Sequence, residues 1–211
     1  MKLFSLFSMT DEQAMWRVQM SGDADAFARL VERWEGPIQG LCTRMTGDLH
    51  RGEDLAQEAF VRVFARRKDW VPSAKFSTFL WRVALNLCYD ELRRRNRRRE
   101  SSLETELEDC SAAQTADEVS PDVSMVRSET AERVRSALME ISETYRSVLV
   151  LRHYEDLKFR EIAEVLGIPE GTVKSRMAEG LSQLALLLER GETYTGGEMP
   201  RAEKTKELLV I

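Results

Sequence analysis

The strongest constraint on the fold is a stretch between residues 75 and 99 with helical spacing of apolar residues on two faces. One stripe comprises Phe76, Phe79, Leu80, Val83, Ala84 and Leu87, and a second comprises Trp81, Leu85, Cys88 and Leu92. A helix that is apolar on two faces is buried between other elements. Because no segment of the chain shows sustained alternation with a period of two, we expect an all-α protein built around this helix.

The same stretch ends in an arginine run with six arginines in seven positions: Arg93, Arg94, Arg95, Arg97, Arg98 and Arg99. Arginines are almost never fully buried without partners, so this end of the helix is expected to be exposed. Guanidinium groups match phosphates and guanine edges, which makes nucleic acid the leading partner. The alternative is a solvated basic helix end that only stabilises the helix C-terminus.

Charge is segregated along the chain. Residues 51–100 carry 13 basic and 7 acidic side chains, whereas the whole chain has a net charge of −5. Residues 101–125 contain seven acidic side chains and no lysine or arginine. This asymmetry indicates a protein that meets nucleic acid with one surface only, rather than a generally basic coat protein. The acidic stretch has too little apolar surface to fold alone, and its charges extend it by self-repulsion.

The chain is therefore expected to contain two small helical domains joined by a flexible acidic linker. We place a loosely ordered lead-in at 1–22, with a short helix around 12–20. The first domain spans 23–99, the linker 100–126, the second domain 127–190 and a C-terminal tail 191–211.

Within the first domain, glycine and proline predict the helix ends. We expect a break at Gly36-Pro37, a turn bracketed by Gly47 and Gly52, and a helix from Glu53 to about Lys68. One face of this last helix is apolar. The opposite face carries a strip at spacing i, i+3, i+4 and i+7 that consists of Asp54, Gln57, Glu58 and Val61. Most polar strips of this kind are simply solvated.

Residues 157–178 fit a helix-turn-helix. Ala163 is small where a second helix crosses, Gly167 suits a left-handed turn residue, and Pro169 can open the second helix. The side chains left outward near the start of that helix are Thr172, Lys174, Ser175 and Arg176. These residue types reach phosphates and base edges. A helical hairpin that does not bind DNA shares the apolar pattern, but the combination with an outward Lys-Ser-Arg favours DNA binding.

Several functional classes lack their sequence signals. We find no Ser/His/Asp or Cys/His arrangement, no phosphate loop and no metal-ligand cluster, so neither an enzyme nor a cofactor is expected. Cys42, Cys88 and Cys110 have no metal-site spacing and predict small core residues in a reducing compartment. No signal peptide or membrane-spanning run is present, which predicts a cytoplasmic protein without membrane insertion.

Three motifs resemble one family. Residues 160–176 read Arg-Glu-Ile-Ala-Glu-Val-Leu-Gly-Ile-Pro-Glu-Gly-Thr-Val-Lys-Ser-Arg, which is similar to the C-terminal DNA-binding domain of sigma factors. Residues 53–60 (Glu-Asp-Leu-Ala-Gln-Glu-Ala-Phe) resemble the polymerase-binding helix of that family. Residues 76–86 (Phe-Ser-Thr-Phe-Leu-Trp-Arg-Val-Ala-Leu-Asn) resemble its promoter-melting segment. With two domains and a single linker, the chain resembles the extracytoplasmic-function (ECF) class.

The resemblance implies a sigma factor that binds core RNA polymerase and directs promoter recognition, DNA melting and transcription initiation. It implies polymerase contacts from Asp54, Gln57, Glu58 and Val61. It implies contacts to the melted upstream promoter element from Lys75, Phe76, Ser77, Trp81, Arg82, Asn86, Arg93, Arg94, Arg95, Arg97 and Arg98. Its helix-turn-helix contacts to the distal element in the duplex are Arg152, Thr172, Lys174, Ser175, Arg176 and Glu179. Partners are then core RNA polymerase, promoter DNA and, as is usual in the family, an anti-sigma factor.

The chain departs from the family pattern after Arg176. Basic residues usually follow, whereas this chain has Ala178-Glu179-Gly180. Glu179 can accept a hydrogen bond from cytosine or repel phosphate, and Gly180 lowers the helix propensity by about 1 kcal/mol. Two other classes stay open from the sequence. One is a homodimeric operator-binding regulator, which leaves residues 53–99 unexplained, and the other is a helical adaptor protein, which leaves Lys174-Ser175-Arg176 unexplained.

Overall fold

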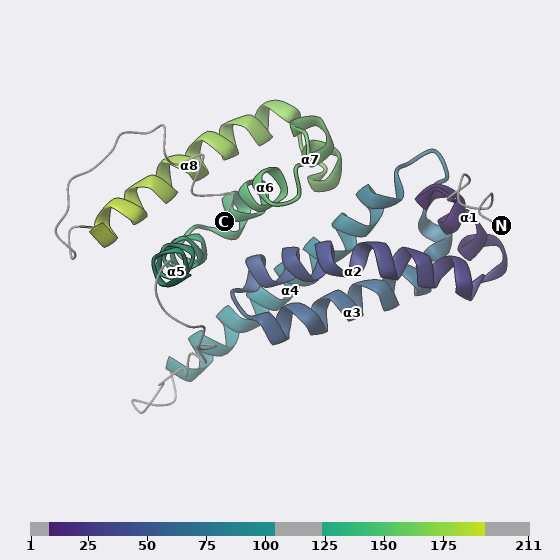
Figure 1. Ribbon diagram of the computed structural model, residues 1–211, viewed down its shortest axis with the longest axis horizontal. Coiled ribbons are helices and arrows are strands. Elements are labelled where there is room, and N and C mark those ends of the chain that lie inside the picture. The colour runs from purple at the N-terminus through teal and green to yellow at the C-terminus, as the bar shows by residue number, and fades with distance from the viewer. Residues whose placement is uncertain (1–8, 104–123, 193–211) are drawn as a thin grey trace.

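A computed structural model of the chain describes residues 9–103 and 124–192, and Figure 1 shows these residues as two helical units. The N-terminal unit (residues 9–103) contains α1 (Asp11–Ser21), α2 (Ala24–Thr46), α3 (Leu49–Ala65), the short 3-10 helix η2 (Arg67–Asp69) and α4 (Phe76–Leu103). The C-terminal unit (residues 124–192) contains α5 (Ser124–Glu140), α6 (Glu143–His153), α7 (Phe159–Leu166) and α8 (Glu170–Glu192). No strand occurs in either range, so the all-α prediction is confirmed. Most of the predicted linker and tail lies outside the described residues.

Helix α4 is the centre of the N-terminal unit, as its two apolar faces predict. It packs against α1, α2 and α3 and, on another side, against α7 of the C-terminal unit. Leu80, Ala84 and Cys88 are fully buried, and Leu85 and Leu87 almost so. The apolar pattern of α4 stops at Leu92. The turns of α4 after this residue extend past the ends of α2 and α3 and project from the rest of the N-terminal unit (Figure 1).

The N-terminal lead-in is more ordered than predicted. The short helix expected around 12–20 is present as α1, and it begins with a capping box in which Thr10 and Gln13 satisfy each other's backbone N–H groups. Ala14, Met15 and Val18 on this helix are buried in the core. The prediction of a loosely ordered segment is therefore wrong for residues 11–21, because a 3.6-residue apolar stripe docks them on α2 and α4.

The break predicted at Gly36-Pro37 is also wrong, since α2 continues through Pro37. A proline inside a helix removes one hydrogen bond and bends the chain. Here, Leu30 and Ile38 on either side of the proline are buried, with exposed fractions of 1% and 0%. Both halves of the helix are thus held against the same core, and tertiary packing outweighs the local penalty.

Gly52 lies inside a helix and does not bracket the turn. Helix α3 starts at Leu49, where the Asp48 carboxylate caps the backbone N–H of Arg51, and the left-handed turn residue is Gly47 with φ 77°. A Cβ atom at position 52 would lie 2.8 Å from the backbone nitrogen of Thr43 and 2.9 Å from its Cα. Glycine at this position therefore permits the close crossing of α2 and α3.

The C-terminal unit contains the predicted helix-turn-helix in α7 and α8. Gly167 ends α7 in the left-handed region with φ 67°, and its N–H donates to the carbonyl of Ala163. Val173 and Leu184 on α8 are fully buried. Gly180, which weakens the helix locally, is buried in the crossing of α6 and α8, where a Cβ would lie 3.2 Å from Leu149 Cδ1. The crossing accounts for a glycine that local propensity disfavours.

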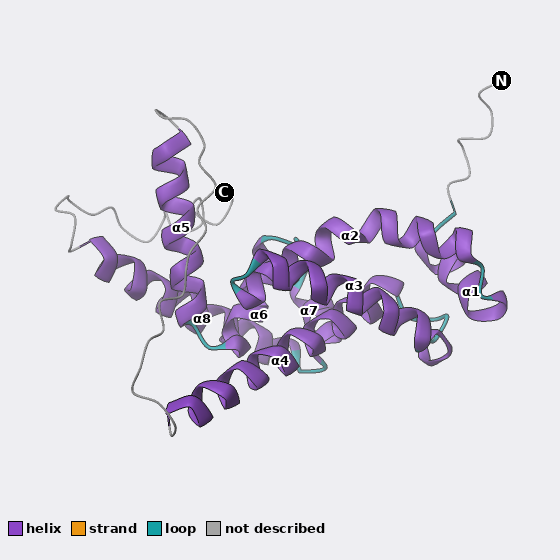
Figure 2. Ribbon diagram, turned by 90° about the horizontal axis from the view of Figure 1, so that it is seen from below, coloured by secondary structure: helices purple, strands orange, loops and turns teal. Residues whose placement is uncertain are grey.

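The two units pack against each other. Helix α2 contacts α5 and α6, and α4 contacts α7, so the C-terminal unit lies along the same helix that carries the arginine run (Figure 2). In the described parts of the chain, no helix is long and apolar enough to cross a membrane. Nor does any group of three His, Cys, Asp or Glu residues within them have the arrangement of a metal site.

Candidate nucleic-acid and protein-binding surfaces

The strip on α3 is largely exposed. Asp54 and Gln57 are exposed, Glu58 is half-buried, and Val61 leaves 67% of its surface accessible. The two carboxylates are paired within the helix, Asp54 with Arg51 at 3.3 Å and Glu58 with Arg62 at 2.6 Å. Such exposed pairs within one helix are weak and can exchange partners. The opposite face of α3 lies in the core, so the strip is available to another protein.

The helix-turn-helix presents three of its six predicted residues to solvent. Lys174, Ser175 and Glu179 are exposed, and Thr172 is half-buried. Lys174 pairs with Glu170 one turn earlier, at 2.7 Å, and the Ser175 hydroxyl donates to the carbonyl of Thr172 at 3.0 Å. These contacts stay within the first turns of α8. The side chains therefore project from the part of the helix that enters the major groove in this motif.

Two arginines of the predicted helix-turn-helix set have neighbours inside the protein. Arg152 donates to the carbonyl of Leu157 at 3.1 Å and lies 5.4 Å from the centre of the Phe159 ring, so it stabilises the turn between α6 and α7. Arg152 is half-buried, and its contact to DNA stays a prediction. Arg176 is half-buried, and its charge acts on Tyr89 of α4. Burial raises the pKa of Tyr89, and the positive charge of Arg176 partly opposes that rise.

Phe76 and Trp81, predicted to stack on unpaired bases, are buried. Phe76 is 0% exposed and Trp81 is 3% exposed. Both rings pack edge-on against Trp34 of α2, at centroid distances of 6.5 and 5.7 Å. The prediction is wrong for Phe76, which is a core residue of the N-terminal unit. Trp81 is also almost fully buried, but it lines a cavity whose opposite wall is formed by the C-terminal unit.

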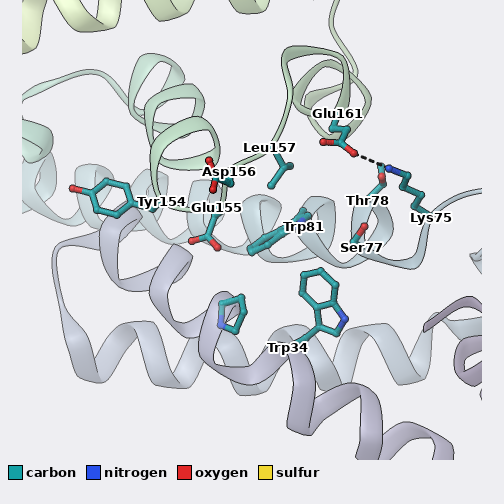
Figure 3. Close-up of a pocket in the computed structure, with 11 residues that line it drawn as sticks. Trp34, Lys75, Ser77, Thr78, Trp81, Tyr154, Glu155, Asp156, Leu157 and Glu161 are labelled. Carbon is teal, nitrogen blue, oxygen red and sulfur yellow. Dashed lines mark hydrogen bonds and ion pairs between the residues drawn. The ribbon is translucent and has the colours of Figure 1, made fainter. Parts of the chain in front are cut away.

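That cavity lies between the two units and has a volume of about 330 Å³. Figure 3 shows Trp81 and Trp34 on one side, Ser77, Thr78 and Lys75 at one end, and Tyr154, Glu155 and Leu157 of the C-terminal unit opposite. Ser77 is half-buried in its wall. The loop between α6 and α7 therefore lies over the first part of the predicted melting segment, whereas Asn86 at its end is exposed.

Lys75 and Arg82, both predicted to contact the melted strand, bind α7 instead. Lys75 Nζ lies 2.6 Å from a carboxylate oxygen of Glu161, and this hydrogen bond raises the pKa of Lys75 and lowers that of Glu161 (Figure 3). Arg82 donates to the carbonyls of Glu164 at 2.5 Å and Val165 at 3.3 Å. These carbonyls belong to the C-terminal turn of α7, which has no intrahelical donors left and carries partial negative charge.

The remaining predicted residues of α4 are exposed. Asn86 is open to solvent, as are Arg93, Arg94, Arg95, Arg97 and Arg98. Arg94 pairs with Glu91 at 2.8 Å, and Arg95 donates to the carbonyl of Thr46 at 3.5 Å. The run thus forms a cationic surface on the projecting end of α4, next to the last turn of α2.

The sequence reasoning missed two charged groups that join the units. Arg146 of α6 is 6% exposed, and it donates to the carbonyls of Leu138, Met139 and Ile141 and, at 2.5 Å, to Met45 of α2. Burial lowers the pKa of this guanidinium. The only signal in the sequence is an arginine within a helix whose Val148 and Leu149 are expected to be buried, and it does not reveal which carbonyls converge on the guanidinium.

Glu155 is the second charged group that joins the units. Its side chain is 8% exposed and pairs with Arg44 of α2 at 3.3 Å. Burial raises the pKa of Glu155 to about 7, against the lowering effect of Arg44. The same arginine stacks on the Tyr154 ring at 4.2 Å. Nothing in the local sequence distinguishes Glu155 from a solvated loop acid.

Comparison with known proteins supports the family resemblance on both units. Residues 30–98 match the family model of sigma-70 region 2, and residues 131–184 match that of sigma-70 region 4. The chain is 36% identical to the ECF RNA polymerase sigma factor SigW of Bacillus subtilis, over 77% of this chain and 89% of SigW. It is 34% identical to the RNA polymerase sigma-H factor of Pseudomonas aeruginosa, over 79% of this chain and 88% of that protein.

Solved structures share the arrangement of helices. CnrH in complex with the cytosolic domain of CnrY superposes with a TM-score of 0.62 at 25% identity, covering 85% of this chain and 97% of CnrH. The sigma factor RpoE in complex with the anti-sigma factor NepR from Bartonella quintana gives a TM-score of 0.60 at 20% identity, covering 79% of this chain and 98% of RpoE. The second likeness concerns the fold alone.

Proposed function

The chain belongs to the family of ECF RNA polymerase sigma factors, and we propose that it directs transcription initiation through three separate surfaces. The strip on α3 binds core RNA polymerase, the exposed face of α8 reads duplex promoter DNA, and the exposed part of α4 holds the melted upstream element. The observation that supports this most directly is the order of the two matched regions, 30–98 and 131–184, on two helical units. Because the polymerase transcribes a bacterial genome in the cytoplasm, the proposal includes a cytoplasmic location.

The polymerase surface consists of Asp54, Gln57, Glu58 and Val61. Its acids can exchange their intrahelical arginines for basic groups on a partner, and the exposed Val61 supplies apolar contact beside them. Single exposed apolar residues are common on protein surfaces, so the acids beside Val61 carry this proposal.

Charge reversal tests this surface. The double variant Asp54→Lys and Glu58→Lys should lose binding to core polymerase while the protein stays folded, because exposed substitutions usually change stability by only about 0.5 kcal/mol. Glu32→Lys with Glu35→Lys, two exposed acids on α2, provides the matched control. Binding is measured by competition with the unmodified protein for core enzyme. If both double variants compete equally well for core enzyme, α3 is not the polymerase-binding surface.

The two proposed DNA-binding surfaces act on different states of the DNA, one on the duplex and the other on the melted strand. Lys174, Ser175 and Arg176 lie at the N-terminal half of a recognition helix, which suits an intact major groove. Asn86 and the arginine run lie on a helix outside that motif, where an amide and cations suit unpaired bases and single-strand backbone. Glu179 accepts a hydrogen bond from Gln183 at 2.8 Å and borders the same face.

Two variants separate these roles in the polymerase holoenzyme. Arg176→Ala should weaken closed-promoter binding by about 1–3 kcal/mol if it contacts a base. Ser182→Ala, exposed further along α8, is the control and should leave binding unchanged. Asn86→Ala should leave closed-promoter binding intact but reduce open-complex formation, followed by permanganate footprinting. Normal opening by Asn86→Ala would exclude it from the melting site.

We also propose a protein inhibitor as partner. RpoE of Bartonella quintana was solved with an anti-sigma factor, and CnrH with the cytosolic domain of CnrY. Both align with more than three quarters of this chain. Co-purification of the tagged protein from its native host would identify such a partner.

A further inference from the structure

Helix α1 makes polar contacts to the segment that joins α3 to α4. This segment, the α3–α4 connection (residues 66–75), contains η2 and leads directly into the predicted melting segment. The side-chain amide of Gln19 donates to the carbonyls of Trp70 at 2.8 Å and Arg67 at 3.1 Å. The same nitrogen lies 3.4 Å from the carbonyl oxygen of Lys68. Because an amide has only two N–H groups, this third contact is shared with one of the other two.

A second residue of α1 holds the other end of the connection. The backbone N–H of Phe76, the first residue of α4, donates to a carboxylate oxygen of Glu12 at 3.3 Å. A carboxylate at this position satisfies one of the free N–H groups of the helix and interacts favourably with its dipole. Glu12 and Gln19 are seven positions apart, about two helical turns, so they lie on the same face of α1. Met15 between them is fully buried, which fixes this helix to the core.

The connection is otherwise held mainly near its middle. Residues 71–75 are all exposed, and Val71 leaves 58% of its surface accessible. The N–H of Ala74 donates to the carbonyl of Val71 at 2.8 Å, which closes a turn but does not fix its orientation relative to α4. Trp70, only 2% exposed, anchors the connection in the core. The contacts from α1 add restraints on either side of these exposed residues.

We propose that α1 positions the α3–α4 connection for promoter melting, with Gln19 and Glu12 as the positioning residues. The inference rests on the proposed function, which assigns Lys75 at the end of the connection to the melted strand. It goes beyond that function because α1 lies outside both matched regions, 30–98 and 131–184, and contributes to none of the three proposed surfaces.

The physical basis of the proposal is preorganisation. A segment that is already ordered loses less conformational entropy when it binds a partner, so it binds more tightly. Every contact from α1 to the connection and to the start of α4 lies within the N-terminal unit, so the restraint does not depend on where the C-terminal unit lies.

Gln19→Glu tests the proposal with a change that keeps the size of the side chain. It replaces the donor with a carboxylate oxygen, which repels the three carbonyls and releases the turn. The measurement is open-complex formation by the holoenzyme, detected by permanganate footprinting on a promoter fragment that the wild-type holoenzyme transcribes. We expect a loss of about fivefold, because one hydrogen bond contributes about that factor. Competition for core enzyme should stay unchanged, and normal opening would overturn the proposal.

Gln13→Glu is the matched control, because it adds the same charge to an exposed position on α1. The Gln13 side-chain oxygen accepts from the N–H of Thr10 at 3.1 Å, and a glutamate oxygen accepts in the same way. Opening should change by less than about twofold. An equal loss for both variants would mean that the added charge repels DNA in general, and would overturn the positioning role.

Gln19→Met removes the donors without adding a charge. It should also lower open-complex formation, and by less than Gln19→Glu, because no repulsion replaces the lost hydrogen bonds. Wild-type opening by Gln19→Met would show that the hydrogen bonds do not position the connection.

Hydrogen exchange in the free protein detects the released connection directly. The backbone amides of residues 66–75 should exchange faster in Gln19→Glu than in the wild type, while those of α2 keep their rates. Faster exchange in α2 as well would mean a general loss of stability, which contradicts a positioning role. Faster exchange confined to the connection, together with normal opening, would overturn the inference while leaving the proposed function in place.

Lys75→Ala distinguishes failure of the inference from failure of the proposed function. In the Lys75→Ala protein, Gln19→Glu should reduce opening less than it does in the wild type, because the side chain that it positions is absent. An equal reduction in both backgrounds would mean that Gln19 acts elsewhere, which overturns the inference. If Lys75→Ala alone opens promoters normally, the assignment of Lys75 to the melted strand is wrong, and the inference fails with it.

Discussion

Glu155 gives a quantitative prediction about the contact between the units. Its carboxylate is almost fully buried beside Arg44 and Tyr154, and burial raises its pKa to about 7 despite the arginine. Other ionisable groups around the same cavity are Asp156, Lys75 and Glu161. Replacement by glutamine keeps the shape and a hydrogen-bonding amide but removes the ionisation. Glu155→Gln should therefore stabilise the protein where the wild type carries a buried charge.

The sign and size follow from linkage. The pKa in the folded protein, about 7, lies above the ordinary value of 4.5, so the folded state binds the proton more tightly than the unfolded state. The stabilisation that comes from this tighter proton binding is fully present below pH 4.5 and is lost as the pH rises to about 7. One pKa unit corresponds to about 1.36 kcal/mol. Compared with a side chain that stays neutral, Glu155 therefore lowers the free energy of unfolding by about 3 kcal/mol at pH 8 and by about 2 kcal/mol at pH 6.

Urea unfolding at pH 6 and pH 8, followed by tryptophan fluorescence, measures this difference. Glu155→Gln should be more stable than the wild type at both pH values, and the advantage should grow by about 1 kcal/mol from pH 6 to pH 8. The exposed Glu132→Gln on α5 is the control, and its difference from the wild type should not grow in this way. A Glu155→Gln protein less stable than the wild type at pH 8 would refute the reasoning, because attraction by Arg44 would then exceed the effect of burial.

Three further substitutions test the packing. Gly52→Ala places a Cβ within 3 Å of the Thr43 backbone and should destabilise the protein by about 3 kcal/mol in urea unfolding, whereas a free helix position would gain stability. Gly180→Ala should not be more stable than the wild type, because contact with Leu149 offsets the gain of about 1 kcal/mol in helix propensity. A gain of that full size would show that the crossing of α6 and α8 has space for the Cβ atom. Arg146→Met leaves four carbonyls without their donor and should cost about 3 kcal/mol, and near-neutral unfolding would mean that water replaces the guanidinium.

The helices of this protein could be predicted from the sequence, because the spacing of apolar residues and the residue types at turns indicate them. The two apolar faces of residues 76–92 predicted a central buried helix, and the spacing around Gly167 predicted the helix-turn-helix. Lys174 and Ser175 could be placed outward because the same helix has its apolar residues on the other side. These signals depend on residues within a few turns of one another, so they are readable along the chain.

Tertiary structure decided what depends on residues far apart in the chain. Pro37 stays inside α2 because both flanking turns are held by one core, and Gly52 is required by Thr43 of the neighbouring helix. Phe76 has a type that suits base stacking, yet the ring of Trp34, 42 positions earlier, encloses it. Arg82 has a type that suits phosphate, yet it binds α7, more than 80 positions later. A side chain carries its chemistry in the sequence, but its partner is set by the packing of whole helices, which local periodicity does not encode.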